Sequence, residues 1–321
     1  MLDLLENDGP GRAAIPDADA SEALAGLSAP RKWLPSRLFY DARGSALFEE
    51  ITRLPEYYLT RVETRILEDA APEIAQATPP GALLVEYGSG SSRKTEILIE
   101  ALPKLLAYAP IDVSPDALAD AAARLKARFP ALRVAPAAGD FHAALRLPAD
   151  LENAPRLGFF PGSTIGNFAP DDAKTLLAHM RRGLGAGGRL ILGVDLMKDA
   201  KILIPAYDDA QGVTAAFNLN ILARLNRDFG ADFDLGGFRH EARLNARESR
   251  MEMHLVSLRP QRARLLGHVF DFAAGETIHT ENSYKYAAAD FAALARAAGW
   301  TPLRQWSDPQ ALFSVHELVA A

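Results

Sequence analysis

Short apolar runs alternate with amphipathic segments through the middle of the chain. The runs are rich in Leu, Val, Ile and Phe and are bounded by glycine, proline or aspartate, which predicts β-strands. The segments between them repeat their apolar positions at helical spacing and are predicted to be α-helices. The predicted strands are 83–86, 105–112, 132–137, 156–160 and 189–195, and the predicted helices are 94–102, 114–129 and 171–184. This alternation is typical of a parallel sheet in an α/β fold.

The alternation stops after residue 196 and resumes near residue 287. Between these points the pattern predicts helical structure over 202–229, a strand over 248–258 and a strand pair around 264–272. From 287 onward it predicts a helix over 290–298, then strands around 303–307 and 313–318. A connection this long inside an α/β fold is usually a functional insertion rather than a loop.

The residues before the first strand predict helices of their own. Apolar positions recur at helical spacing over 19–27, 37–51 and 61–71. Pro72 is expected to end or kink the last of these helices, because proline removes a backbone donor and crowds the preceding turn.

Composition and charge narrow the class of protein. The chain has 321 residues and a net charge of −6, with no basic excess that would indicate binding to nucleic acid. It has no cysteine, which excludes disulfides, thiolate metal sites and a cysteine nucleophile. The N-terminus is acidic and lacks a basic segment followed by an apolar core, and no run has the length of a membrane span. We therefore expect a cytoplasmic protein.

The end of the first predicted strand has the features of a cofactor-binding turn. Glu86 is followed by Gly88, Ser89 and Gly90. Glycines here let the backbone approach a ligand, and the next helix presents free N–H groups to it. A dinucleotide-binding turn has a third glycine, which this chain lacks, so the pattern favours S-adenosylmethionine. A tight turn without any ligand is the alternative.

Two further strand ends strengthen this interpretation. Asp112 ends the second strand, where a carboxylate can accept both ribose hydroxyls, although it can also cap the next helix. Asp140 and Phe141 follow the third strand, where an acid can take the adenine amino group and an aromatic ring can stack on the base. They can equally be a turn aspartate and a core phenylalanine. Because these strand ends meet at one edge, together they predict a site for an adenosine-containing cofactor. Lys94 can meet the cofactor's carboxylate or be a solvated helix residue.

Longer motifs support a more specific interpretation. With them the chain resembles the ergothioneine-pathway L-histidine Nα-methyltransferases, over nearly its whole length after about residue 30. The motifs are Gly162-Ser-Thr-Ile-Gly-Asn167-Phe, Phe39-Tyr40-Asp-x-x-Gly-Ser, Thr52-Arg-Leu-Pro-Glu-Tyr57-Tyr58, Ala206-Tyr207-Asp-Asp-x-x-Gly-Val-Thr-x-x-Phe-Asn-x-Asn, Ala231-Asp-Phe-Asp-Leu, Met251-Glu-Met253 and Thr280-Glu281-Asn-Ser283-Tyr-Lys285.

The resemblance implies an α/β fold with two parts. A Rossmann-like class I methyltransferase domain would comprise residues 61–196 and 286–321. An inserted α+β substrate-binding domain would comprise residues 20–60 and 197–285, after a flexible N-terminus over 1–19. This division agrees with the break in the hydrophobic pattern.

The resemblance also implies roles for individual residues. Tyr57, Asn167 and Tyr207 would hold the carboxylate and amino end of the substrate, in a site that includes Gly162 and is lined by Tyr40. Glu281 and Ser283 would bind the imidazole, and Met253 would shape its pocket. A carboxylate and a hydroxyl can together address both ring nitrogens of histidine. Outside the motifs, the same residues have ordinary structural roles as turn, core or surface residues.

The implied reaction is transfer of three methyl groups from S-adenosylmethionine to the α-amine of L-histidine. It gives hercynine for ergothioneine biosynthesis and S-adenosylhomocysteine. Tyr40 and Tyr57 are the candidate catalytic residues, as proton relays, and no strong base is assigned. We expect no metal, because His240, His254, His268 and His279 are scattered along the sequence without ligand spacing.

Other functions stay open at this point. The same fold could methylate another aromatic amino acid such as tryptophan, although an indole offers no acceptor to match Glu281 and Ser283. The chain could also be a non-catalytic S-adenosylmethionine-binding protein or, less consistently with its glycine turn, a nicotinamide oxidoreductase. We expect a monomer that binds a small molecule and neither nucleic acid nor membrane.

Overall fold

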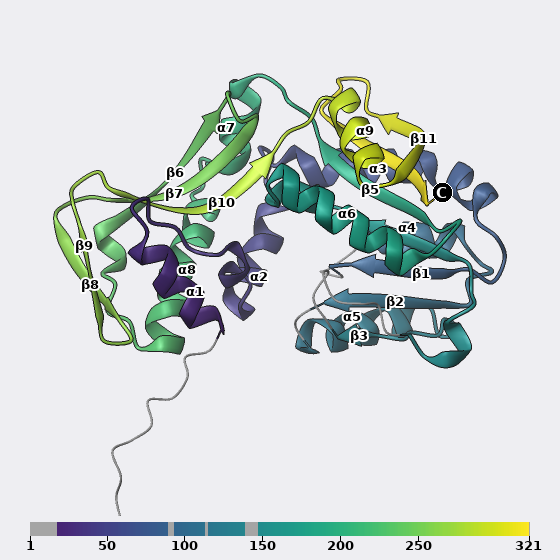
Figure 1. Cartoon of the computed structure of the whole chain (residues 1–321), viewed down its shortest axis with the longest axis horizontal. Helices are drawn as coiled ribbons and strands as arrows, with labels where there is room; N and C mark the ends of the chain where they lie inside the picture. Colours follow the sequence, from purple (N-terminus) through teal and green to yellow (C-terminus); the bar gives the residue numbers. More distant parts are fainter. Residues whose placement is uncertain (1–17, 89–92, 113–114, 139–146, 321) are drawn as a thin grey trace, which may run out of the picture.

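The computed structural model describes residues 18–88, 93–112, 115–138 and 147–320. The predicted flexible N-terminus, 1–19, lies almost wholly outside the described residues. In Figure 1 the described chain forms two lobes, one built on a large sheet and one on a smaller sheet.

The large sheet has the strand order β11-β12-β5-β4-β1-β2-β3. Strands β1 to β5 run parallel, whereas β12 is antiparallel to both β5 and β11. This confirms the predicted α/β fold with a mainly parallel, Rossmann-like sheet. The strands are β1 (Leu83–Tyr87), β2 (Ala107–Asp112), β3 (Ala137–Ala138), β4 (Arg156–Phe160), β5 (Arg189–Asp195), β11 (Trp300–Ser307) and β12 (Phe313–Ala320).

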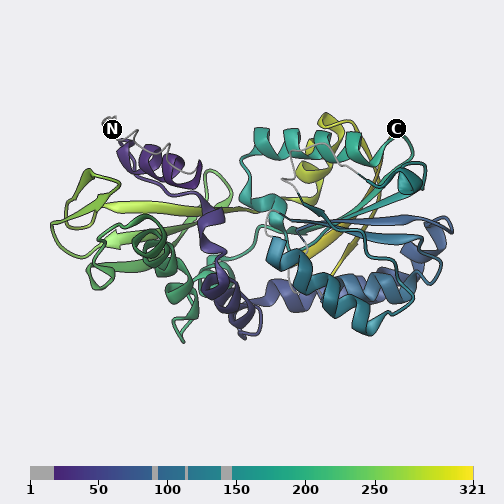
Figure 2. The same ribbon diagram turned by 90° about the horizontal axis from the view of Figure 1, so that it is seen from below.

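Helices cover both faces of this sheet, as Figure 2 shows nearly edge-on. Leu84 belongs to the core beneath α3 and α4, whereas its neighbours Leu83 and Val85 belong to the core beneath α6 and α9. Strands buried on both faces explain the continuous apolar runs in the sequence. The covering helices are α3 (Tyr58–Ala77), α4 (Arg93–Ala101) and α5 (Pro115–Arg128) on one face, and α6 (Pro170–Leu184) and α9 (Ala288–Ala297) on the other.

Helix α3 does not end at Pro72, so the expected helix end is wrong, and the alternative of a kink stays a prediction. It continues to Ala77 with Pro72 inside it. Ala70, Ala71 and Ile74 are buried on either side of the proline. Burial of this face against the sheet outweighs the backbone hydrogen bond that the proline removes.

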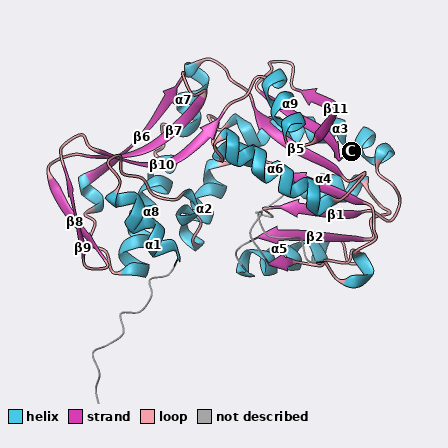
Figure 3. Ribbon diagram, viewed as in Figure 1, coloured by secondary structure: helices cyan, strands magenta, loops and turns pink. Residues whose placement is uncertain are grey.

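The second lobe contains a three-stranded antiparallel sheet, β10-β7-β6, with a two-stranded hairpin beside it (Figure 3). The predicted helix over 202–229 is two helices, because Gly212 adopts a positive φ of 74° and caps the second of them. Two strands, β6 and β10, were not predicted. The elements are α7 (Ala200–Tyr207), α8 (Val213–Phe229), β6 (Phe238–Asn245), β7 (Arg250–Ser257), β8 (Gln261–Leu265), β9 (His268–Phe272) and β10 (Thr277–Tyr284).

The N-terminal segment packs with this second lobe rather than with the large sheet. Helices α1 (Ala18–Ser28) and α2 (Ala42–Ile51) flank the 3₁₀ turn η1 (Ser36–Phe39). Trp33 forms a β-bridge with His279 of β10, and α2 packs against α8. Segments far apart in sequence therefore build one lobe.

Two of the connections between the lobes run side by side. The chain leaves the large sheet at Asp195 and returns at Tyr286, where Leu196 and Tyr286 form a parallel bridge. The Tyr286 N–H donates to the Asp195 carbonyl, and the Met197 N–H donates to the Tyr286 carbonyl. In Figure 1 the arrowheads of β1 and β2 point toward the second lobe, so the carboxyl edge of the large sheet faces it.

Among the helices that the structure describes, none combines the length and the apolar character needed to cross a lipid bilayer.

Candidate functional site

The predicted cofactor turn lies at the carboxyl edge of β1. Gly88 follows the strand with a φ of 79°, and its N–H donates to the Ile111 carbonyl of β2 at 2.9 Å. Asp112 is the last residue of β2, which places it at the same edge, although its side chain is not among the described ones. The predictions for Ser89, Gly90, Asp140 and Phe141 fall outside the described residues.

Glu86 points into the interior rather than along the edge. Its carboxylate is fully buried and accepts hydrogen bonds from Thr95, at 2.7 Å, and from Tyr108. Thr95 belongs to α4, so Glu86 ties the helix after the glycine turn to β1 and β2. The predicted contact of Glu86 with the cofactor stays a prediction.

Lys94 and Gly162 meet at a buried acid that the sequence did not single out. Glu63 of α3 is 0% exposed, and its two oxygens accept the Gly162 N–H at 2.9 and 2.8 Å. Its Oε2 also pairs with the ammonium group of Lys94, whose side chain is 14% exposed. A Cβ at residue 193 would lie 2.0 Å from Glu63 Oε1, so Gly193 makes room for this carboxylate. The sequence could have pointed to Glu63, because it is an acid on the face of α3 that the apolar pattern predicts to be buried.

Three tyrosines approach one another where the lobes meet. The rings of Tyr57 and Tyr207 lie 6.3 Å apart, and Phe48 contacts both Tyr57 and Tyr40. Tyr57 and Tyr207 are buried, whereas Tyr40 is 44% exposed. Burial, reinforced by neighbouring acidic groups, raises the pKa of Tyr57 and of Tyr207 well above the ordinary value. These phenols therefore keep their protons at neutral pH.

An amide and an acid from different lobes meet beside these tyrosines. Asn167 ends the 3₁₀ turn η3 (Thr164–Asn167) after β4, and its Nδ2 donates to Glu281 Oε1 of β10 at 3.2 Å. Glu281 lies opposite Met253 of β7. Burial raises the pKa of the Glu281 carboxyl to about 7, an effect that the charge of Lys285 partly opposes. Glu281 is thus the acid of this group that can change its charge near neutral pH.

A β-bulge controls which side chains reach this region. His279 pairs with His254 and Glu281 pairs with Met253, so one extra residue, Thr280, lies between the two pairs on β10. Successive residues of a strand face opposite sides, so the bulge puts His279 and Glu281 on opposite faces although they are two residues apart. Bulges next to functional sites often redirect side chains in this way.

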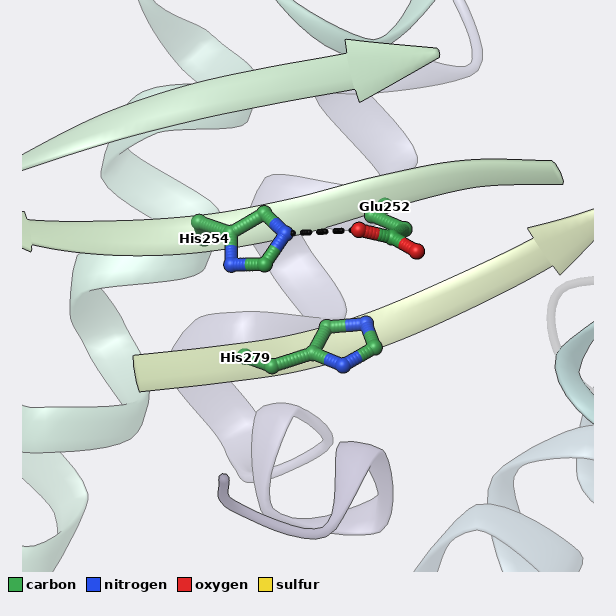
Figure 4. A group of neighbouring side chains, drawn as sticks. All are labelled: Glu252, His254 and His279. Atoms are coloured by element: carbon green, nitrogen blue, oxygen red, sulfur yellow. Dashed lines mark hydrogen bonds and ion pairs between the residues drawn. The ribbon is translucent and has the colours of Figure 1, made fainter. Parts of the chain in front are cut away.

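The face away from the tyrosines holds Glu252, His254 and His279 (Figure 4). The sequence-based view that these histidines are scattered is wrong for this pair. Their rings stack with centroids 4.8 Å apart and planes 19° apart. The lone pairs of two nearly parallel imidazoles lie in separate planes, which does not suit a shared metal ion. Together with Glu252 they form a hydrogen-bonded polar surface.

A buried ion-pair network, also missed in the sequence, joins the lobes beneath the tyrosines. Asp195 at the end of β5 pairs with Lys285 at 2.6 Å, and both side chains are 0% exposed. Lys198 pairs with the same carboxylate at 2.6 Å, and Tyr58 donates to it at 2.8 Å. The Lys285 ammonium group further donates to Tyr207, at 2.7 Å.

Most of the predicted substrate residues are thus close together. Tyr207 and Ser283 share a hydrogen bond of 2.9 Å, and Ser283 also accepts from Lys285 at 2.8 Å. Tyr40 is near enough to Glu281 for their charges to interact. Gly162 differs from the others, because Glu63 takes its N–H. The predicted residues that gather where the lobes meet are Tyr40, Tyr57, Asn167, Tyr207, Met253, Glu281 and Ser283.

Comparison with known proteins identifies the family of this chain. A family model described as "Histidine-specific methyltransferase, SAM-dependent" matches residues 19–320. The "Histidine N-alpha-methyltransferase" of Mycolicibacterium smegmatis is 43% identical over 92% of this chain and 94% of its own length. The protein of the same name from Mycobacterium tuberculosis is 41% identical over 89% of this chain and 90% of its own length.

A fungal protein and a solved structure are more distant. "Ergothioneine biosynthesis protein 1" of Neurospora crassa is 32% identical over 87% of this chain, which matches only 32% of that protein. The crystal structure of an S-adenosylmethionine-dependent methyltransferase from Clostridium acetobutylicum has a TM-score of 0.49 and 14% identity, covering 85% of this chain and 98% of that one.

Proposed function

Because the chain belongs to the histidine-specific, S-adenosylmethionine-dependent methyltransferase family, we propose that it transfers three methyl groups to the α-amine of L-histidine. The product is hercynine, the trimethyl betaine of histidine, made for ergothioneine biosynthesis. The observation that carries this proposal is the family match over 19–320. The side chains gathered between the lobes support it.

The cofactor edge of the large sheet suits S-adenosylmethionine. Gly88 turns the chain with a positive φ at the end of β1, and Asp112 ends the neighbouring strand. Lys94 brings a cation that can meet a carboxylate, with Glu63 holding its ammonium group. When bound there, S-adenosylmethionine supplies an electrophilic methyl group on a sulfonium sulfur. Gly88, Lys94 and Asp112 are the residues that we assign to it, together with Glu86 and the predicted residues outside the described ones.

The histidine site is proposed on the other side of this edge. Tyr57, Asn167 and Tyr207 hold the carboxylate and the amino end, in a pocket lined by Tyr40 and close to Gly162. Glu281 and Ser283 bind the imidazole, and Met253 packs against it. Support comes from their convergence: Asn167 touches Glu281, and Tyr207 touches Ser283. Residues 20–60 and 197–285 would then form the substrate-binding domain, and residues 61–196 and 286–321 the methyltransferase domain.

Positioning carries most of this mechanism. The amine must lose a proton before each transfer, because only a nitrogen lone pair can displace the sulfonium methyl group. Tyr57 has a raised pKa and stays a phenol, so it orients the amine and passes its proton on rather than acting as a strong base. Tyr40 is 44% exposed as a residue, but burial raises the pKa of its phenol, so it also stays protonated and can relay that proton. Fixed alignment of amine and methyl group can supply about 7–11 kcal/mol of barrier reduction.

The remaining expectations belong to the same proposal. We propose that the protein works as a cytoplasmic monomer, without a metal, and binds neither nucleic acid nor a membrane. Its polar imidazole pocket disfavours tryptophan, because an indole has a single donor and no acceptor.

Mass spectrometry tests the function directly. Purified protein is incubated with S-adenosylmethionine and a mixture of the standard amino acids. We expect histidine alone to gain three methyl groups. Methylation of another amino acid would keep the fold and the cofactor but overturn the pocket assignment. Tight cofactor binding with no product at all would favour the non-catalytic alternative.

A further inference from the structure

Lys285 has a place in this site that the proposed function does not use. Its ammonium group is fully buried and reaches three oxygen atoms: Asp195 Oδ2 at 2.6 Å, Tyr207 Oη at 2.7 Å and Ser283 Oγ at 2.8 Å. A lysine ammonium has three N–H groups and no acceptor. All of its donors are therefore occupied, and Lys285 cannot itself bind a substrate.

The direction of these bonds constrains the two hydroxyls. Lys285 only donates, so the hydrogens of Tyr207 and Ser283 must both point away from its Nζ. One of these hydrogens lies in the bond of 2.9 Å that joins the two oxygens. In the described part of the chain, no protein atom accepts the other hydrogen. The pair can therefore give one hydrogen bond to a ligand.

The charge of the ligand's ring decides whether the ring can accept the hydrogen bond that the Tyr207–Ser283 pair offers. A neutral imidazole has one N–H, which Glu281 can accept, and one bare nitrogen, which can accept from Ser283. An imidazolium has two N–H groups and would need Ser283 to act as an acceptor, next to the positive charge of Lys285. Coulomb repulsion at this range in a buried site is substantial. The charged and titratable groups that surround the Lys285 ammonium are Asp195 of β5, Lys198 after it, Tyr58 of α3, Tyr207 of α7 and Glu281 of β10.

When Tyr207 is the donor in its bond to Ser283, the hydrogen left for the ligand is that of Ser283, and Tyr207 meets the substrate amine as an acceptor. On this arrangement we propose that Lys285 is a specificity-determining positioning residue: it keeps Ser283 a donor toward the ring, so that the pocket selects histidine with a neutral imidazole ring. The inference rests on the proposed function, since it assumes that Ser283 and Glu281 face the imidazole. It adds a role for a residue that acts on the substrate only through Tyr207 and Ser283.

A charge-state probe tests this without relying on turnover. Calorimetry measures the binding of L-histidine, and of its 1,2,4-triazole analogue, to the protein saturated with S-adenosylhomocysteine, at pH 8 and at pH 5.5. The triazole ring stays uncharged over this range, whereas histidine becomes mostly imidazolium. With a free imidazole pKa near 6.5, about one tenth of histidine is neutral at pH 5.5, so the wild-type preference for the triazole should rise about tenfold. Titration of Glu281, of the amine and of the cofactor affects both ligands and cancels in their ratio.

Two variants separate positioning from structural support. Lys285→Met should reduce the tenfold rise to about twofold or less, because Ser283 is then free to accept an N–H and the cation is gone. Lys198→Met is the matched control: it removes a lysine from the same Asp195 carboxylate without touching Tyr207 or Ser283, and it should keep the tenfold rise. In a Ser283→Ala background, Lys285→Met should add no further change.

The outcomes are distinguishable. If wild-type protein does not bind histidine at pH 8, the proposed function itself fails. If histidine binds but the ratio rises tenfold in Lys285→Met as well, Lys285 has only a structural role and the inference is overturned. Asp195 keeps Lys198 and Tyr58 as partners in that variant, which favours folding. Should circular dichroism show it unfolded, Asp195→Asn combined with Lys285→Met removes both charges, and the same loss of the tenfold rise is expected.

Discussion

The two faces of strands β7 and β10 contrast sharply. One face presents Glu252, His254 and His279, residue types that commonly bind metals or carry out acid–base chemistry. The other presents Glu281, Ser283 and Met253, of which a methionine and a serine attract little notice. Yet the histidine-bearing face has stacked rings and paired hydrogen bonds, whereas the second face meets Asn167 and Tyr207 from other elements.

The contrast teaches that orientation, rather than residue type, separates a site from a polar surface. Glu252 and Glu281 are both acids on neighbouring strands, but their surroundings shift the pKa of the two carboxyl groups in opposite directions. Although burial opposes it, hydrogen bonds from Asn245, His254 and Arg250 lower the pKa of Glu252 to about 2. Burial with few such partners raises the pKa of Glu281 to about 7. The bulge at Thr280 allows both environments within one strand pair.

The largest expected difference between the faces is catalytic. Glu281→Gln removes the carboxylate proposed to accept the imidazole N–H. Loss of a charge-assisted hydrogen bond of this kind should lower kcat/KM for histidine by about 10- to 100-fold. Glu252→Gln is the matched change on the other face and should alter kcat/KM by less than about twofold. Steady-state kinetics measures kcat/KM for histidine in both variants. Equal decreases in kcat/KM would show that the two faces do not differ in function.

The fold could be predicted largely from the hydrophobic pattern, because the central strands of the large sheet, β1, β4 and β5, are buried on both faces. The strands 156–160 and 189–195 were predicted with the boundaries that the structure has. Strands β6 and β10 were missed because polar residues occupy buried positions in both strands, His240 in β6 and Thr280 and Ser283 in β10. The alternating period weakens where one face of a sheet is polar.

Only the site residues that lie in recognisable motifs could be predicted from the sequence; their pairing with residues elsewhere could not. The resemblance supplied Asn167, Tyr207 and Glu281, which the structure brings close together. Asp195 and Lys285 are ninety residues apart in sequence, and their pairing depends on the exit and return connections running side by side. Glu63 was hidden for a similar reason, because its partners Lys94 and Gly162 come from different strand–helix connections.

A smaller difference between the faces should appear in stability. The folded-state pKa of Glu281, about 7, lies above the ordinary 4.5, so between these values the folded protein binds more protons than the unfolded chain. Its contribution to the free energy of unfolding is present at low pH and is lost as the pH rises from 4.5 to 7. The loss should be at most about 1.4 kcal/mol per pH unit, less any solvent screening.

Urea unfolding at pH 5 and pH 7 measures this effect by difference. Wild type should lose stability relative to Glu281→Gln as the pH rises. The folded-state pKa of Glu252 is lowered to about 2, so its contribution is lost only as the pH falls below about 4.5. Glu252→Gln should therefore follow wild type between pH 5 and pH 7. If the difference in the free energy of unfolding between wild type and Glu281→Gln were the same at pH 5 and pH 7, the folded-state pKa of Glu281 would be ordinary.

The smallest expected effect is that of metal removal, and it probes the histidine face most directly. Glu252 is ionised and only accepts, so His254 Nε2 must carry the hydrogen of their bond of 3.0 Å. His279 Nε2 likewise donates to the Glu281 carbonyl at 3.0 Å. Both Nε2 atoms are thereby taken, and the stacked rings keep the remaining lone pairs in separate planes. Dialysis against EDTA should change turnover of histidine by less than about twofold, as should His254→Gln combined with His279→Gln, because neither ring faces the pocket. EDTA could instead abolish turnover, with zinc restoring it in wild type but not in the double variant. That result would show that the face with His254 and His279 holds a metal ion needed for activity.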